Sequence, residues 1–237
     1  MPKLSIVIPT RRLDASLAGR IHASLAPLPD VEVLVIEPDD VTASPQPELL
    51  ANPDPDLALS AAPISLLKAP RGRGTQCNAG AQAATGELLL FLHDDTELPG
   101  EAIACIDHAF GNPRVGAACF RLRFDRAHWL LGLYAACSRV ESLLTTFGDQ
   151  GLVIRRRVFD DLGGFPDWPL FEDVELARRL RQRSRLVKLP ATVTTSAVRF
   201  ERNGMLRQQL LNAMLLARFL LGAKPEKLAA RYEGRRD

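Results

Sequence analysis

The sequence predicts an α/β fold with a mostly parallel central sheet flanked by helices. Residues 4–9 (LSIVIP) and 31–37 (VEVLVIE) are continuous apolar runs rich in β-branched residues, as in buried strands. Residues 13–26 between them have apolar positions at helical spacing. Neither strand has a polar side for water, and a helix joins the two. We therefore expect a parallel sheet that is covered on both faces.

The alternation of strands and helices continues along the chain. Pro38–Pro63 holds six of the seventeen prolines and is predicted to be a surface loop, because it cannot sustain a long helix or a central strand. We then expect a strand at Ile64–Ala69, a helix of small residues at Thr75–Ala84 and a strand at Glu87–Leu92. The later expected elements are a helix over 100–110, an extended segment over 115–124, helices over 127–144 and 173–183, strands over 186–189 and 192–198, and a helix over 205–221.

Composition and charge exclude several classes of function. The 237 residues are 46% hydrophobic, enough to bury the core of a domain. Lys and Arg (30) nearly balance Asp and Glu (28), which argues against a nucleic-acid partner. The four cysteines are widely spaced and form no Cys-x-x-Cys pair, so we expect reduced thiols in a cytoplasmic protein. We expect no secretory signal and no membrane span, because no uncharged apolar stretch reaches about 18 residues.

The sharpest polar cluster follows the last strand of the first half. The segment LLLFLHDDTEL places His93, Asp94 and Asp95 at the carboxyl end of an apolar strand, the edge where open α/β sheets bind ligands. Carboxylate oxygens there suit Mg²⁺ or Mn²⁺ holding a diphosphate, because the metal can bridge two phosphate oxygens. The alternative is an ordinary acidic turn that caps the next helix, and it is the commoner one for two adjacent aspartates.

A second cluster, RGRGTQCNAG, leads into the predicted helix of small residues. It is neither a P-loop nor a dinucleotide fingerprint, because no Gly-Lys-Ser/Thr follows and Cys77 stands where the third glycine is needed. A helix N-terminus beside Arg71 and Arg73 is suited to an anion. Solvated loop arginines are the alternative.

Two further clusters lie in the second half of the chain. An aromatic loop delivers Glu172 and Asp173 to the start of a helix, where a carboxylate could deprotonate a hydroxyl near a metal-bound diphosphate. The alternative is that these carboxylates only complement the helix dipole. The segment Thr145–Gly151 sets Asp149 and Gln150 between glycines, either facing a cleft or in a plain tight turn.

Taken together and in this order, SIVIPT, VEVLVIE, RGRGTQCNAGAQAATGELLLFLHDDT, GDQGLVIRR and FEDVELARRLR resemble the family 2 glycosyltransferases of the GT-A fold. The resemblance covers residues 3–200. More narrowly, the HDDT turn, the GDQ turn and PLFEDVEL look like the small bacterial transferases associated with radical-SAM and selenodomain proteins. The resemblance implies a GT-A domain over 1–200, with a nucleotide-binding part (1–98) and an acceptor and catalytic part (99–200), followed by a helical extension (201–237).

The resemblance also implies an activity and roles for residues. A hexose would move with inversion from a nucleoside-diphosphate donor, UDP being the expected nucleotide, to the hydroxyl of an acceptor that the sequence does not identify, with help from Mn²⁺ or Mg²⁺. Asp173 would be the general base, and Asp95 would bind the metal together with His93. The donor would lie against Pro9, Thr10, Glu37, Arg73, Gln76, Asn78 and Asp94. The acceptor side would include Asp149, Gln150, Trp168 and Glu172.

Other interpretations stay open at this point. One is a catalytically inactive nucleotide-binding scaffold, because His93 stands at the first position of the family's metal-binding Asp-x-Asp motif. Many members of the family also supply a His metal ligand from the C-terminal half, whereas every histidine here precedes residue 129. A nucleotidyltransferase is less favoured, because no Lys-bearing glycine loop follows the first strand. Residues 199–237 carry nine Lys or Arg and four Asp or Glu around an apolar helix. Such a helix suits peripheral contact with the inner face of a membrane, packing on the catalytic domain, or a homodimer.

Overall fold

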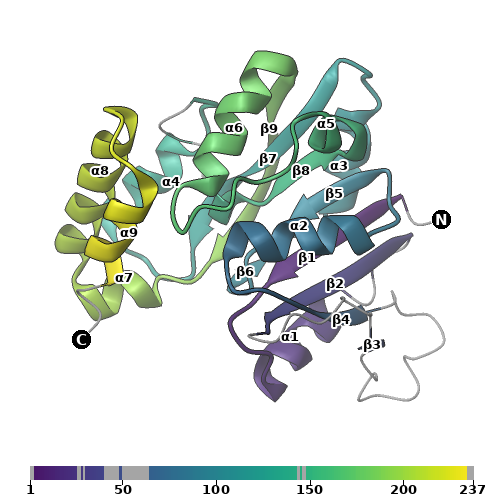
Figure 1. Cartoon of the computed structure of the whole chain (residues 1–237), viewed down its shortest axis with the longest axis horizontal. Coiled ribbons are helices and arrows are strands. Elements are labelled where there is room, and N and C mark those ends of the chain that lie inside the picture. The colour runs from purple at the N-terminus through teal and green to yellow at the C-terminus, as the bar shows by residue number, and fades with distance from the viewer. Residues whose placement is uncertain are drawn as a thin grey trace.

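The described residues form a nine-stranded sheet with helices on both of its faces (Figure 1). The computed structural model describes residues 3–25, 28, 30–39, 48–49, 64–142, 145 and 148–233. The strands are β1 (Leu4–Pro9), β2 (Val31–Pro38), β3 (Glu48–Leu49), β4 (Ile64–Ala69), β5 (Leu88–Phe91), β6 (Thr96–Glu97), β7 (Val115–Phe124), β8 (Leu152–Arg155) and β9 (Arg185–Thr195). Their order in the sheet is β3-β4-β2-β1-β5-β8-β7-β9-β6.

The helices connect and cover these strands. They are α1 (Ala15–Leu25), α2 (Arg73–Ala83), α3 (Ala102–Phe110), α4 (Trp129–Cys137), α5 (Arg156–Asp161), α6 (Glu172–Arg183), α7 (Val198–Asn203), α8 (Met205–Leu220) and α9 (Pro225–Glu233), with a 3₁₀ turn η1 (Gly148–Gln150). In Figure 1, α2 and α6 lie in front of the sheet, and α7, α8 and α9 form a separate group at one side. Among the described residues, no helix combines the length and hydropathy needed to cross a bilayer.

The sheet is mixed, which corrects the expectation of a mostly parallel one. β1 is parallel to β2 and β5, β2 is parallel to β4, and β7 is parallel to β9. β8 runs antiparallel to both β5 and β7, and the short strands β3 and β6 are antiparallel to their neighbours. The apolar sequence of β8 indicates a strand that is buried on both faces. It does not indicate whether the strand runs parallel or antiparallel to its neighbours. Its reversal places the turn before β8 at the edge where β1 and β5 end.

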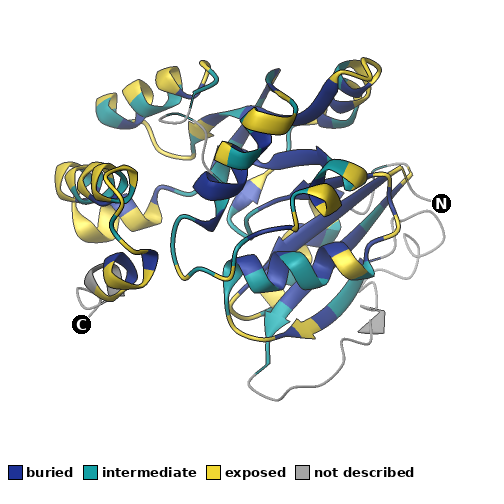
Figure 2. Ribbon diagram, turned by 45° about the horizontal axis from the view of Figure 1, so that its top comes forward, coloured by how far each residue is buried: buried dark blue, intermediate teal, exposed yellow. Residues whose placement is uncertain are grey.

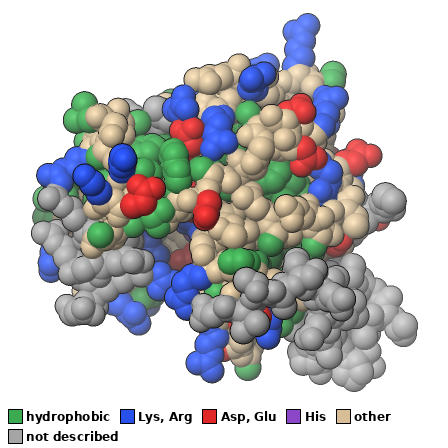
Figure 3. Space-filling model, in the orientation of Figure 1, with side chains coloured by type: hydrophobic (Ala, Val, Ile, Leu, Met, Phe, Trp, Pro, Cys, Tyr) green, Lys and Arg blue, Asp and Glu red, His purple; other side chains and the backbone are tan. Residues whose placement is uncertain are grey.

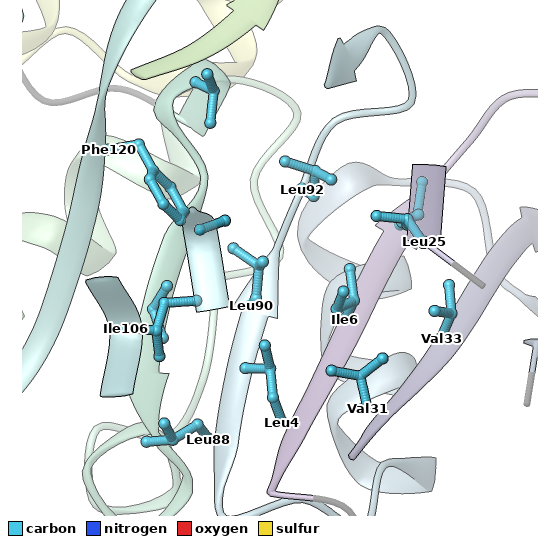
Figure 4. Close-up of a cluster of buried hydrophobic side chains, with 14 of the residues drawn as sticks. Leu4, Ile6, Leu25, Val31, Val33, Leu88, Leu90, Leu92, Ile106 and Phe120 are labelled. Atoms are coloured by element: carbon cyan, nitrogen blue, oxygen red, sulfur yellow. The ribbon is translucent and has the colours of Figure 1, made fainter. Parts of the chain in front are cut away.

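Two apolar clusters hold the helices on opposite faces of the sheet. Leu4, Ile6 and Ile8 of β1 pack with α1 and α3, whereas Val7 packs with α2, α5 and α6. Successive side chains of a strand point to opposite faces, so β1 contributes to both clusters. Figure 4 shows the first cluster, in which a row from Leu88 to Leu92 lies beside β1. Figure 2 shows that the strands are mostly buried while the C-terminal helices are largely exposed.

Most elements lie where the sequence predicts them, and the differences fall mainly in the second half. The two strands expected over 186–189 and 192–198 form the single strand β9, and Val198 begins α7. Pro190, which lacks an N–H, is accommodated where the pairing of β7 with β9 shifts register between Cys119 and Arg121. The helix expected over 127–144 ends at Cys137. Most of the predicted loop, residues 40–47 and 50–63, lies outside the described residues, as do 143 and 144.

Helix α2 packs close to the sheet because Gly80 has no side chain. A Cβ at this position would lie 2.5 Å from Val7 Cγ1 and 2.7 Å from Ile36 Cδ1. We expect Gly80→Ala to lower the free energy of unfolding by about 1–3 kcal/mol, measured by urea denaturation. The control is Gly19→Ala in α1, where the added Cβ meets nothing within 4 Å and should stabilise by about 0.5–1 kcal/mol. Equal effects of the two substitutions would contradict this packing.

Candidate active site

Chain reversals in the sheet bring several polar segments to one edge. β1, β5 and β9 end there, and β8 begins there because it is antiparallel to β5 and β7. The segments at this edge are Thr10 after β1, His93–Asp95 after β5, Asp149 before β8 and Ser196–Arg199 after β9. The carboxyl ends of parallel strands are where open α/β sheets bind ligands.

A cavity of about 590 Å³ opens beside this edge. Five of the residues predicted from the sequence line it: Arg73, His93, Asp95, Asp149 and Asp173. Its other walls come from α4, α7, α8 and the loop before α6. In Figure 3, hydrophobic side chains gather between the C-terminal helices and the body of the molecule, next to acidic and basic groups. The volume is within the usual range for small-molecule sites, about 300–1,000 Å³.

Asp173 is held in a defined orientation in the first turn of α6. The backbone N–H of Gly148 donates to Asp173 Oδ2 at 2.6 Å, and the N–H of Val174 donates to Oδ1 at 2.8 Å. A Cβ at Gly148 would lie 2.8 Å from Asp173 Oδ2, so only glycine lets η1 approach this closely. The helix N-terminus also favours a negative charge at this position. Asp173 therefore faces the cavity as an oriented carboxylate.

Arg73 connects the first half of the site to the second. Its Nε donates to Glu172 Oε1, and its Nη2 lies 3.5 Å from Asp173 Oδ2. Glu172 is only 2% exposed, and its Oε2 has no hydrogen-bond partner among the described residues. Burial raises the pKa of Glu172, and the charge of Arg73 opposes this rise. The structure thus uses Glu172 to hold Arg73 in place.

His93 is also bound by Arg73. Its Nε2 lies 3.0 Å from Arg73 Nη1, and burial together with the charges of Arg73 and Arg199 holds its pKa well below the ordinary value. A neutral imidazole accepts this hydrogen bond at Nε2, which places the ring proton on Nδ1. The nitrogen that faces Arg73 is therefore engaged within the protein.

Asp95 is the carboxylate of the predicted metal site. Its Oδ1 lies 3.4 Å from the hydroxyls of Thr96 and Thr195. Burial raises the pKa of Asp95, and the neighbouring charge of Asp94 raises it further. No group of three or more His, Cys, Asp or Glu side chains suited to a metal occurs in the part of the chain that the structure describes. Mg²⁺ is often bound through one or two carboxylates plus substrate phosphates, and this donor set fits that pattern.

Asp149 is half-buried, and one of its carboxyl oxygens is buried without a protein partner. Its Oδ1 makes no hydrogen bond among the described residues. Burial, followed by the charges of Asp173 and Asp95, raises its pKa to about 7. A buried oxygen of this kind would be satisfied by a proton, a cation or a donor group of a ligand. When it is ionised, Asp149 adds to the negative charge that favours a cation beside Asp95.

The raised pKa of Asp149 predicts a pH dependence of stability. The folded protein holds this proton more tightly than the unfolded chain, whose carboxyl has the ordinary value of 3.8. The free energy of unfolding should therefore fall as the pH rises from about 4 to about 7, and level off above that. In buffer containing a chelator, Asp149→Asn should lack this component, so that its stability gain over the wild type grows across the same pH range. Parallel stability curves for the two proteins would contradict it.

The predicted donor residues outside the cavity mostly bind backbone. Gln76 Nε2 donates to the carbonyls of Thr10 (2.8 Å) and Ile36 (2.7 Å), and so ties the ends of β1 and β2 together. Asn78 is paired twice with the backbone of Phe165, at 2.9 Å in each direction. In both residues the amide is used to position α2. Neither arrangement depends on a ligand.

The remaining predicted donor residues lie around the end of β1. They are Pro9, the last residue of that strand, and Thr10, Glu37 and Asp94. The hydroxyl of Thr10 donates to Asp94 Oδ2 at 2.7 Å. Glu37 Oε1 accepts from the backbone N–H of Leu13, which holds the loop between β1 and α1. Pro9 lines a small cavity of about 30 Å³ that also contacts Arg73, His93 and Asp173. These residues are brought together at the same sheet edge, next to the large cavity.

Two of the predicted acceptor residues have structural partners. Gln150 is fully buried, donates to the carbonyl of Thr145 at 2.6 Å and accepts from Lys188 Nζ. The ring of Trp168 packs edge-on against Phe219 of α8, with centroids 5.9 Å apart. Gln150 thus fixes the turn that carries Asp149. Trp168 fixes the position of α8.

Arg199, after β9, lines the cavity although it is not among the residues predicted from the sequence. Its charge lowers the pKa of His93 and opposes the rise at Asp95, so it lies within electrostatic reach of both. The signal was its place just after a strand that ends at the ligand-binding edge. Because the strand was expected to run to residue 198, the turn between Thr195 and Val198 was not predicted.

Comparison with known proteins gives structural matches only. The sequence matches no protein-family model and no curated protein. The structure is similar to the mannosyltransferase PcManGT from Pyrobaculum calidifontis in complex with GDP-Man and Mn²⁺ (TM-score 0.55, 19% identity, covering 81% of this chain and 56% of that one). It is also similar to residues 1–349 of S. aureus TarS in complex with UDP-GlcNAc (TM-score 0.55, 16% identity, 82% and 58%), and to TarS 1–349 in a second structure (0.54, 14%, 98% and 71%).

The chain has a glycosyltransferase fold. It spans a little over half the length of the PcManGT chain and of the TarS chain bound to UDP-GlcNAc. At these identities the similarity shows the fold alone. Membership of family 2 and of the narrower bacterial subgroup therefore stays a prediction.

Proposed function

We propose that this protein is an inverting glycosyltransferase that moves a sugar from a nucleoside-diphosphate donor to an acceptor hydroxyl. One observation carries the proposal: Asp95, Asp149 and Asp173 face a single cavity at the strand-end edge of a glycosyltransferase fold. Two of the similar proteins are in complex with GDP-Man and UDP-GlcNAc, which supports a nucleotide-sugar donor. More specifically, we propose that the protein is a family 2 glycosyltransferase and that its donor is a UDP-sugar.

Asp173 acts as the general base in the proposed reaction. It accepts the proton of the acceptor hydroxyl while the acceptor oxygen attacks the anomeric carbon from the side opposite to the diphosphate. The new C–O bond forms as the bond from the anomeric carbon to the diphosphate oxygen breaks, and the nucleoside diphosphate leaves. Gly148 N–H and Arg73 keep Asp173 oriented during this step. No covalent intermediate with the protein is needed.

The leaving diphosphate requires positive charge. When bound, Mn²⁺ or Mg²⁺ held by Asp95 would neutralise charge that develops on the diphosphate oxygens. We propose that Arg199, on the wall of the same cavity, contributes to the same end from the protein.

Calorimetric titration of UDP, GDP and dTDP, each with and without Mn²⁺, tests this site. We expect one nucleotide to bind in a Mn²⁺-dependent manner, and Asp95→Asn to weaken that binding about tenfold or more. The matched control is Asp107→Asn, a carboxylate of α3 that pairs with Lys3 outside the cavity. Binding that is independent of both Mn²⁺ and Asp95 would refute the assigned metal-diphosphate site.

The second candidate is a nucleotide-binding scaffold without catalysis. The hydrogen bond between Arg73 and His93 Nε2 favours it. His93 stands at the first position of the Asp-x-Asp motif, and a nitrogen that already accepts a hydrogen bond is not available to bind a metal. The scaffold predicts nucleotide binding without any turnover of the donor. Exposed apolar residues of α8 such as Leu206 and Leu210 suit a membrane surface and a second subunit equally well.

A further inference from the structure

The cavity has two chemically different sides. The carboxylates and arginines of the proposed site form one side, at the sheet edge and the start of α6. On the other side apolar residues of β7, α4, the loop before α6, α7 and α8 predominate, among them Phe124, Leu130, Leu133, Phe171, Phe200 and Leu216. Ser138, Gln209 and Asn212 are polar residues on this side, and Ser138 Oγ and Asn212 Oδ1 accept hydrogen bonds from within the protein. The proposed reaction uses the polar side and assigns nothing to the apolar one.

The apolar side is connected to the proposed base. Phe171 lines the cavity two residues before Asp173 and has a φ of 65°, a conformation that costs a bulky residue strain. Its ring stacks on Phe219 of α8, with centroids 4.8 Å apart and planes inclined by 25°. Trp168 contacts the same ring. The loop that presents Asp173 and the helix that supplies Leu215 and Leu216 are therefore packed together.

The nature of this wall discriminates between kinds of acceptor. A sugar or glycan acceptor carries several hydroxyls, and each one that lies against an apolar surface loses its hydrogen bonds to water without replacement. An acceptor with one hydroxyl and an apolar body loses little and gains from removing that body from water. The cavity must also hold the transferred sugar, so about 590 Å³ leaves room for a compact second molecule.

We infer that the acceptor is a small alcohol or phenol whose hydroxyl is attached directly to an apolar body. The hydroxyl lies at Asp173, and the body lies against the wall formed by α4, α8 and Phe171. This inference rests on the proposed function, because it names the acceptor class for the same site. Small free alcohols and long-chain lipid alcohols both have an apolar body. We propose the small free alcohol, because the cavity volume of about 590 Å³ suits a compact molecule.

A matched pair of probes tests the acceptor class. Cyclohexylmethanol and methyl glucoside both carry a primary hydroxyl on a six-membered ring, and they differ in the polarity of that ring. With the nucleotide sugar that the protein binds, we expect cyclohexylmethanol to be glycosylated and methyl glucoside to be used at least about tenfold less efficiently. A preference for methyl glucoside, or for a long-chain alcohol presented in vesicles, would overturn the inference.

A pair of variants in α8 locates the binding site without using the donor. Ala213 and Ala217 are both exposed and lie one turn apart, but only Ala213 is among the residues that line the cavity. Saturation-transfer NMR should detect cyclohexylmethanol bound to the wild type. Ala213→Trp should weaken this binding about tenfold or more by filling the cavity, while Ala217→Trp should leave it unchanged. No binding to the wild type, or equal effects of both variants, would overturn the inference.

The two readouts separate this inference from the proposed function. If cyclohexylmethanol binds at the Ala213 side but no nucleotide sugar is turned over, the apolar ligand class is supported and the transferase function fails. If the donor is turned over with methyl glucoside alone, the function stands and the acceptor class is overturned.

Discussion

Asp173→Asn is expected to lower kcat for sugar transfer by about 10²–10⁴-fold, because the amide cannot accept the proton of the attacking hydroxyl. The substitution is nearly isosteric, so the hydrogen bond from the Gly148 N–H can be retained. Nucleotide binding should change little, because Asp95 and not Asp173 is assigned to the diphosphate side. The measurement is the initial rate of nucleoside-diphosphate release with a saturating acceptor, alongside a calorimetric titration of the nucleotide.

The matched control for this variant is Asp161→Asn. Asp161 is an exposed carboxylate at the end of α5 and lines none of the cavities described above. Its variant should keep the wild-type rate. If Asp173→Asn also kept the full rate, the base would have to be another group. Asp149 would be the first candidate, because it faces the same cavity and Asp95 is assigned to the metal. That outcome would remove the proposed mechanism while leaving the fold and the nucleotide site intact.

Arg73→Met is expected to lower the free energy of unfolding by about 3 kcal/mol, because it leaves the carboxylate of Glu172 buried without a charge partner. This is the low end of the usual range for breaking a buried ion pair, since the Arg73 side chain is 39% exposed and solvent screens part of the interaction. Glu172 is 2% exposed, so water cannot replace the guanidinium. Urea denaturation at pH 7 measures the effect.

A double variant separates the cost of an unpaired charge from the loss of packing. Arg73→Met combined with Glu172→Gln removes both charges, and it should recover more than half of the lost stability. If the double variant were less stable than Arg73→Met alone, the charge of Glu172 would not be the source of the cost. The pair would then act mainly through packing of the Arg73 side chain.

The strands and the acidic edge could be predicted from sequence because they depend on local patterns. Continuous apolar runs mark β1, β2 and β5, and polar residues that follow such runs must lie at a strand-end edge. His93 and Asp95, predicted at this edge, line the cavity that Asp173 also lines. The direction of β8 is not a local property, because a strand buried on both faces has the same composition whichever way it runs.

The partners of polar side chains were less accessible to sequence reasoning. The family resemblance assigns Gln76 and Asn78 to the donor, yet their amides bind carbonyls and an N–H from residues distant in the chain. Such contacts depend on how α2 packs against the sheet and the Phe165 loop. The apolar wall was missed for a similar reason, since apolar residues of α8 suit a membrane, a second subunit or a cavity equally well until the helix is placed.

The central claim is that nucleotide-sugar turnover depends on Asp173, and donor turnover by the purified protein tests it most directly. The protein is incubated with UDP-, GDP- and dTDP-sugars, Mn²⁺ and cyclohexylmethanol, and the release of nucleoside diphosphate is followed together with the glycosylated product. We predict release from one nucleotide class with a product of inverted anomeric configuration, and loss of both in Asp173→Asn. Nucleotide binding without release from any donor, with this acceptor, with methyl glucoside or with water, would contradict the claim and favour the scaffold.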